Sequence, residues 1–135
     1  MPAGPEALGF AYFAAVKFVG YTAAAVYLKR KIPRSIASPW LLGGVRTAIG
    51  IGVGMGAVWI ASKLGILKSE VGWYVLLAPI RICEWLILLG LFFRHPAWEW
   101  SRSLKLALLA TVWSYILDIP AVLAVFVIPG GAWIC

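Results

Sequence analysis

The sequence predicts an all-α integral membrane protein: a single domain over residues 1–135, built as a bundle of four membrane-spanning helices joined by short loops. Apolar residues make up 63% of the 135 residues and the mean hydropathy is +0.93, whereas soluble domains are roughly 45–50% apolar. A chain of this size could not bury so much apolar surface in water. Four long apolar runs predict the spans, and each is long enough to cross about 30 Å of hydrocarbon. They cover residues 8–28, 40–62, 71–93 and 105–128.

The first run, over residues 8–28, contains a single charge, Lys17, and is followed at once by the basic block Lys29, Arg30 and Lys31. No Lys or Arg precedes the run, whereas a secretory signal begins with a basic segment. We therefore expect the run to be a retained span.

The second run contains Arg46 and a glycine-dense centre. Gly50 and Gly54 form one GxxxG pair, and Gly52 and Gly56 form another. The first pair lies on the same helical face as Arg46, and the second points roughly the opposite way. We therefore expect the first pair to pack inside the bundle. The second pair is expected to pack on another copy of the chain, giving a homo-oligomer.

The third run carries Arg81 and Glu84 near its centre, and the fourth carries Asp118. A charge at the centre of a membrane helix costs about 2.5–3.5 kcal/mol, and each large apolar residue returns only about 0.3–0.6 kcal/mol. Arg81 and Glu84 share one helical face, so other helices are expected to neutralise that face. Pro79 and Pro120 each lie two residues from a charge and remove a backbone hydrogen bond. Missing backbone hydrogen bonds of this kind occur where transporters bind solutes, and they also occur where a helix simply bends.

The distribution of basic residues predicts the topology. Most Lys and Arg residues lie in the segments after the first and third runs, and the two tails hold none. The positive-inside rule then places these segments in the cytoplasm and both termini outside. We expect an integral protein of a bacterial-type inner membrane, with lipids as partners. The net charge of +7 is assigned to topology, so no nucleic acid is expected.

Charges inside the predicted spans define the candidate site. Counted from the cytoplasmic helix ends, they lie about 10–18 Å deep at about 1.5 Å per residue, so one layer can hold them all. Charges that face lipid are costly, and we expect these to face inward and pair. The layer would hold three cations and two anions: Lys17, Arg46, Arg81, Glu84 and Asp118. Polar neighbours at helical spacing complete the predicted substrate-binding set: Tyr21, Ser114 and Tyr115.

This layer favours transport or channel-like passage of a small anionic or amphiphilic solute, with the two carboxylates as counter-ions or proton acceptors. One alternative is a membrane enzyme that uses Glu84 and Asp118 as acid and base on a lipid-like substrate. No catalytic residue is assigned otherwise. A second alternative is an accessory subunit whose charges pair with a partner. A purely structural role is the third, with ion pairs such as Arg81–Glu84 and Arg46–Asp118 that fix helix register. No cofactor or metal is expected, because no ligand motif occurs.

Overall fold

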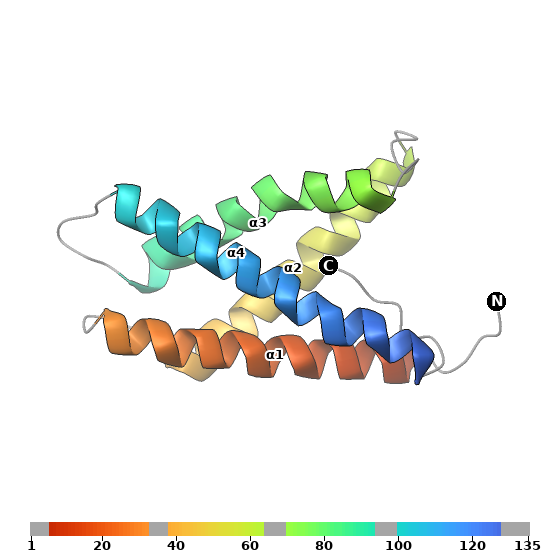
Figure 1. Cartoon of the computed structure of the whole chain (residues 1–135), viewed down its shortest axis with the longest axis horizontal. Coiled ribbons are helices and arrows are strands. Elements are labelled where there is room, and N and C mark those ends of the chain that lie inside the picture. The colour runs from red at the N-terminus through yellow and green to blue at the C-terminus, as the bar shows by residue number, and fades with distance from the viewer. Residues whose placement is uncertain (1–5, 33–37, 64–69, 94–99, 128–135) are drawn as a thin grey trace.

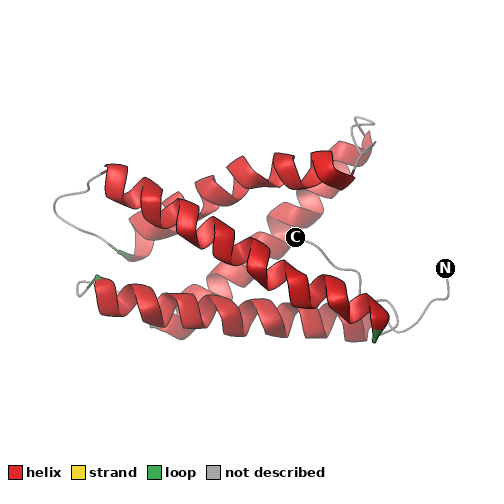
Figure 2. Ribbon diagram, viewed as in Figure 1, coloured by secondary structure: helices red, strands yellow, loops and turns green. Residues whose placement is uncertain are grey.

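The computed structural model describes residues 6–32, 38–63, 70–93 and 100–127, and every element in them is helical (Figures 1 and 2). The predicted all-α class is therefore confirmed. Four α-helices follow one another along the chain, and a short 3-10 helix, η1, continues the last. Their bounds are α1 Glu6–Lys31, α2 Pro39–Lys63, α3 Glu70–Phe92, α4 Trp100–Leu123 and η1 Ala124–Phe126.

The bounds of α4 differ more from its predicted run than those of the other helices do. This helix begins at Trp100, whereas the predicted run begins at residue 105, and its α-helical part ends at Leu123. Polar residues at a helix end continue the backbone hydrogen bonding beyond the apolar run. The early start places Arg102 and Lys105 on the helix itself.

Three of the helices are long and apolar enough to cross a membrane: Ala7–Lys31, Pro39–Lys63 and Trp100–Pro120. Over the part of α3 that the structure describes, the apolar run falls short of that length and composition. The chain is thus compatible with a membrane protein, and its fourth span is considered below with the proposed function.

Packing between the helices is uneven. Helix α1 packs along α2, α3 packs along α4, and α1 crosses α4, whereas α2 and α3 make much more limited contact. Glycines allow the close approaches. A Cβ on Gly43 would overlap Thr22, including its backbone, and a Cβ on Gly20 would overlap the side chain of Leu117. In Figure 1, α1 and α4 meet near the start of α1 and diverge toward its end.

The apolar core fills the half of the bundle that contains the end of α1 and the start of α4. Its fully buried centre includes Trp85, Leu88 and Ala107. The buried polar and charged side chains lie next to this core, farther toward the start of α1. Large apolar residues such as Val19, Leu91 and Leu109 are exposed on the outer helix faces, as lipid contact would require.

Candidate functional site: a buried cluster of five charges

The structure brings the five charges of the predicted layer together. Each is at most 8% exposed, and each of the four helices supplies at least one. Three ion pairs connect them within the described residues: Lys17–Asp118, Arg81–Asp118 and Arg46–Glu84. We call this set the charge cluster.

Asp118 holds two cations from two other helices. Its Oδ1 accepts a hydrogen bond from Lys17 Nζ, and its Oδ2 lies 2.6 Å from Arg81 Nη2. Lys17 Nζ also donates to the backbone carbonyl of Ser114 at 3.3 Å. The guanidinium of Arg81 lies 4.3 Å from the ring centre of Tyr115, in cation–π geometry. One carboxylate on α4 thus ties α1 and α3 to the same point.

Arg46 forms the second part of the cluster. Its Nη2 lies 2.8 Å from Glu84 Oε2. Its guanidinium carbon lies 4.9 Å from the ring centre of Tyr21 and 5.3 Å from that of Trp85. Its Nε and Nη1 have no hydrogen-bond partner among the described residues, although both atoms are buried. Buried N–H groups left in this state cost free energy, more so on a charged side chain.

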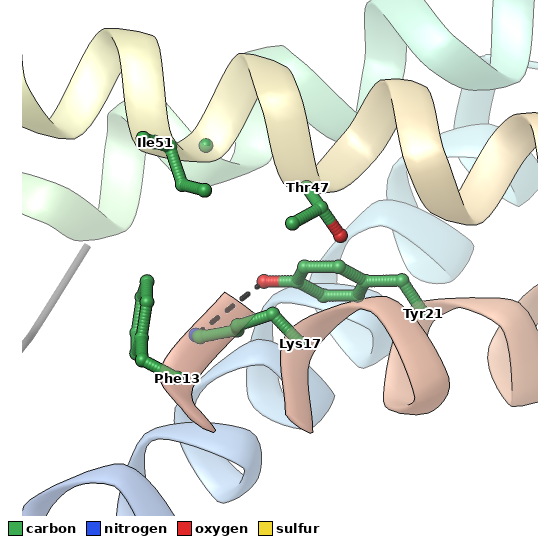
Figure 3. Close-up of a pocket in the computed structure, with 6 residues that line it drawn as sticks. Phe13, Lys17, Tyr21, Thr47 and Ile51 are labelled. Atoms are coloured by element: carbon green, nitrogen blue, oxygen red, sulfur yellow. Dashed lines mark hydrogen bonds between the residues drawn. The ribbon is translucent and has the colours of Figure 1, made fainter. Parts of the chain in front are cut away.

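Two small hollows adjoin the cluster. In each, the volume open to the centre of a water molecule is about 10 Å³. That is about the space one water needs. The first lies between α1 and α2, and Figure 3 shows Lys17 and Tyr21 facing Thr47 and Ile51 across it. The second lies between α2 and α3. Its lining comprises Arg46, Gly50, Val53, Gly54, Leu77, Ile80, Arg81 and Glu84.

Gly50 lines both hollows. A Cβ at this position would lie 3.0 Å from Arg46 Nη1, so only glycine leaves this side of the guanidinium uncovered. The predicted shared face of Arg46 and the Gly50/Gly54 pair is therefore the face that borders the second hollow.

The predicted polar neighbours lie around the cluster. Tyr21 is buried, and its hydroxyl oxygen accepts a hydrogen bond of 3.5 Å from Lys17 Nζ. Ser114 is fully buried; its hydroxyl accepts a hydrogen bond of 3.1 Å from Trp85 Nε1 and donates one of 3.0 Å to the carbonyl of Ala110. Tyr115 is half-buried beside the cluster.

The ion pairs differ from the arrangement considered for a purely structural role. That arrangement pairs Arg46 with Asp118 and leaves Lys17 without an ion-pair partner. In the structure, Arg46 pairs with Glu84, and Asp118 is shared by Lys17 and Arg81. The reason is geometric: Lys17 lies where α1 crosses α4, beside Asp118, whereas Arg46 on α2 reaches Glu84 on α3.

The set predicted from the sequence does not include two aromatic residues of the site. The ring centre of Phe13 lies 5.5 Å from Lys17 Nζ. Trp85 is fully buried and lies against Arg46. Helical spacing carries a signal for both, because Phe13 precedes Lys17 by four residues and Trp85 follows Arg81 by four.

The second glycine pair of α2 faces away from the charge cluster. A Cβ on Gly52 or Gly56 would meet no described atom within 4 Å. The homo-oligomer contact through this pair stays a prediction. His95 and Cys135 lie outside the described residues.

The cluster is chemically suited to holding a small anion. Its formal charge is positive by one, both carboxylates are ion-paired, and two nitrogen atoms of Arg46, Nε and Nη1, have no acceptor among the described residues. No protein-family model matches the chain, and no curated protein or solved structure matches it either.

Proposed function

We propose that this protein passes a small inorganic anion across a membrane by way of the charge cluster. The observation that carries the proposal is the unbalanced cluster itself: three buried cations share two carboxylates, and Arg46 keeps two N–H groups without an acceptor among the described residues. A net charge in a low-dielectric interior is costly. A bound anion would neutralise the cluster and accept those hydrogen bonds.

The proposal places all four helices across the membrane, with both termini outside. The ion pairs of α3 support a fourth span. Glu84 on α3 pairs with Arg46 on α2, and Arg81 on α3 pairs with Asp118 on α4. Since α2 and α4 are themselves long and apolar enough to span, α3 must lie at the same depth to make both pairs.

The second hollow suggests where the anion enters. It lies between α2 and α3, the neighbouring pair with limited contact. Gly50 and Gly54 line it without side chains, and Arg46 and Arg81 line it with positive charge. A small separation of α2 from α3 would enlarge this space with little loss of packing.

The pairing of the carboxylates favours anion passage over acid–base catalysis. Glu84 and Asp118 each bind at least one cation, so both act as counter-ions within the cluster. The adjoining hollows have room for about one water, which is far too little for a lipid-like substrate. Both carboxylates also pair with cations of this chain, so a partner subunit is not needed to form these ion pairs.

Anion flux into vesicles tests the proposal. Purified protein in liposomes should admit chloride or nitrate, followed by quenching of an anion-sensitive dye trapped inside. Arg46→Gln should lower the flux at least tenfold, because it removes the cation that has unused donors. Lys63→Gln is the matched control, since Lys63 is exposed at the end of α2, and its flux should equal that of the unchanged protein.

Both variants must show the same helical circular dichroism and the same gel-filtration profile as the parent. Flux that is absent for every halide and for nitrate in folded parent protein would contradict the proposal. Equal flux in the parent and in Arg46→Gln would contradict the role of the cluster.

A further inference from the structure

A large apolar groove lies outside the charge cluster, between the second half of α1 and the first half of α4. Its volume is about 430 Å³, within the range of about 300–1,000 Å³ typical of small-molecule sites. Its lining contains no charged side chain among the described residues: Ala23, Ala24, Tyr27, Leu28, Leu106, Leu109, Ala110 and Trp113.

The groove has a closed inner end and a floor. At the inner end, Trp113 Nε1 donates a 3.0 Å hydrogen bond to the carbonyl of Gly20, where α1 and α4 meet. Beyond this point the two helices diverge (Figure 1). The buried side chains of Leu28 and Ala110 form the floor, and Tyr27 and Leu109 stand exposed at the sides. The groove lies between helices that meet at Trp113 and diverge toward the end of α1 (Figure 1), and we call it the slot.

The open end of this slot is basic. Lys31 Nζ lies 5.9 Å from the ring centre of Tyr27, which lines the slot. Arg102 and Lys105 are exposed, and each lies four residues before a lining leucine on the same face of α4. No carboxylate occurs in the described residues of this half of either helix. We call Lys31, Arg102 and Lys105 the basic rim.

We infer that the slot binds an anionic phospholipid, with one acyl chain along the groove and the phosphate group at the basic rim. The apolar lining fits a chain but gives little affinity by itself, because the surrounding bilayer is equally apolar. The rim supplies the selectivity, since each Lys or Arg near the surface attracts an anionic headgroup. This inference rests on the groove and its rim and does not depend on the passage of anions.

Lipid binding to the full chain in detergent tests the inference by native mass spectrometry. The probes are phosphatidylglycerol and phosphatidylcholine with identical acyl chains. Phosphatidylglycerol should bind more tightly, and each of Lys31→Gln and Arg102→Gln should weaken it about fivefold, the factor for about 1 kcal/mol. Lys63→Gln, a basic residue away from the groove, should leave it unchanged.

A second pair of variants tests the groove itself. Ala23→Phe fills the slot from an exposed position and should lower binding of both lipids. Ala15→Phe is the matched control, because Ala15 is equally exposed on α1 but does not line the slot. Circular dichroism and gel filtration should show unchanged folding in all variants.

Three outcomes would overturn the inference. Equal binding of the two lipids would show that the rim selects nothing. Rim variants that match Lys63→Gln would show that the phosphate lies elsewhere. A change of oligomeric state in Ala23→Phe, with lipid binding intact, would show that another protein helix occupies the slot.

Discussion

Ion pairs of the charge cluster join three helix contacts, and two of these contacts are built differently. Where α1 crosses α4, Gly20 lies against Leu117, Trp113 binds the backbone of α1, and Lys17 pairs with Asp118. Where α2 faces α3, Arg46 pairs with Glu84 across a hollow, and the helices otherwise touch little. The first contact is packed around its ion pair, and the second depends much more on the ion pair.

The difference assigns separate roles to charges that look alike in the sequence. The Lys17–Asp118 pair lies at a packed helix crossing and holds α1 and α4 in register, although Lys17 also lines the first hollow. A charge pair beside a hollow, with N–H groups left over, can bind a ligand. We expect substitutions at the α1–α4 contact to change stability most, and substitutions at the α2–α3 contact to change anion passage most.

The two carboxylates give the largest expected effect. Asp118→Asn removes a counter-ion shared by Lys17 and Arg81, and should lower the free energy of unfolding by about 3–5 kcal/mol. Glu84→Gln removes the counter-ion of Arg46 alone, next to a hollow that admits water, and should cost about 1–3 kcal/mol. Unfolding by sodium dodecyl sulfate in mixed micelles measures both values.

Added anion sharpens this comparison. In Glu84→Gln, high concentrations of chloride or nitrate should restore part of the lost stability, because a bound anion stabilises the folded state. The control is a sulfate-free buffer of the same ionic strength, in which a bulky organic anion replaces the chloride or nitrate. Equal costs for the two variants, or equal restoration, would contradict the difference between the contacts.

Glycine substitutions give the next effect. Gly20→Ala places a methyl group against Leu117 and should cost about 1–3 kcal/mol through overpacking. Gly50→Ala meets only the end of the Arg46 side chain, so its stability should change by less than about 1 kcal/mol. Its anion flux should fall, because the methyl group narrows both hollows. A Gly50→Ala variant with full flux would remove the α2–α3 hollow from the route.

The hydrogen bond from Trp113 gives a smaller effect. Trp113→Phe keeps an aromatic ring and loses the donor to Gly20, and should cost about 0.5–1.5 kcal/mol. Trp40→Phe is a control on an exposed residue of α2 and should be close to neutral. Anion flux should be unchanged in both, and a loss of flux in Trp113→Phe would link the α1–α4 contact to the route.

The outward glycine pair gives the smallest effect on the folded chain. Gly52→Ala should change stability by no more than about 0.5 kcal/mol, because its Cβ meets no described atom within 4 Å. Gly52→Leu with Gly56→Leu should abolish dimerisation, measured by cross-linking in lipid, if copies pack through this face. Dimers that persist in the double variant would place the interface elsewhere.

The sequence was sufficient to predict the helices and the gathering of the five charges in one layer. The apolar runs gave the helices, and counting residues from their basic ends placed Lys17, Arg81 and Asp118 at similar depth. The ion pairs could not be predicted, because depth does not say which helices are neighbours. The crossing of α1 on α4 decides that Lys17 meets Asp118.

Two further features also depend on helix neighbours. Nε and Nη1 of Arg46 lack an acceptor among the described residues, because the ion pair with Glu84 uses Nη2 and Gly50 has no side chain to cover the other side of the guanidinium. The groove between α1 and α4 exists because these helices diverge after Gly20, which no local pattern in either helix indicates.

The odd number of charges in the cluster has a consequence for energetics across the membrane. Three ionised cations and two carboxylates leave one positive charge, which a single monovalent anion would neutralise at the site. The anion still carries its own charge across the membrane, and this makes the proposed uncoupled passage electrogenic. A membrane potential of about 100 mV contributes about 2.3 kcal/mol per elementary charge moved across the full field. The direction of flow would then follow voltage as well as concentration.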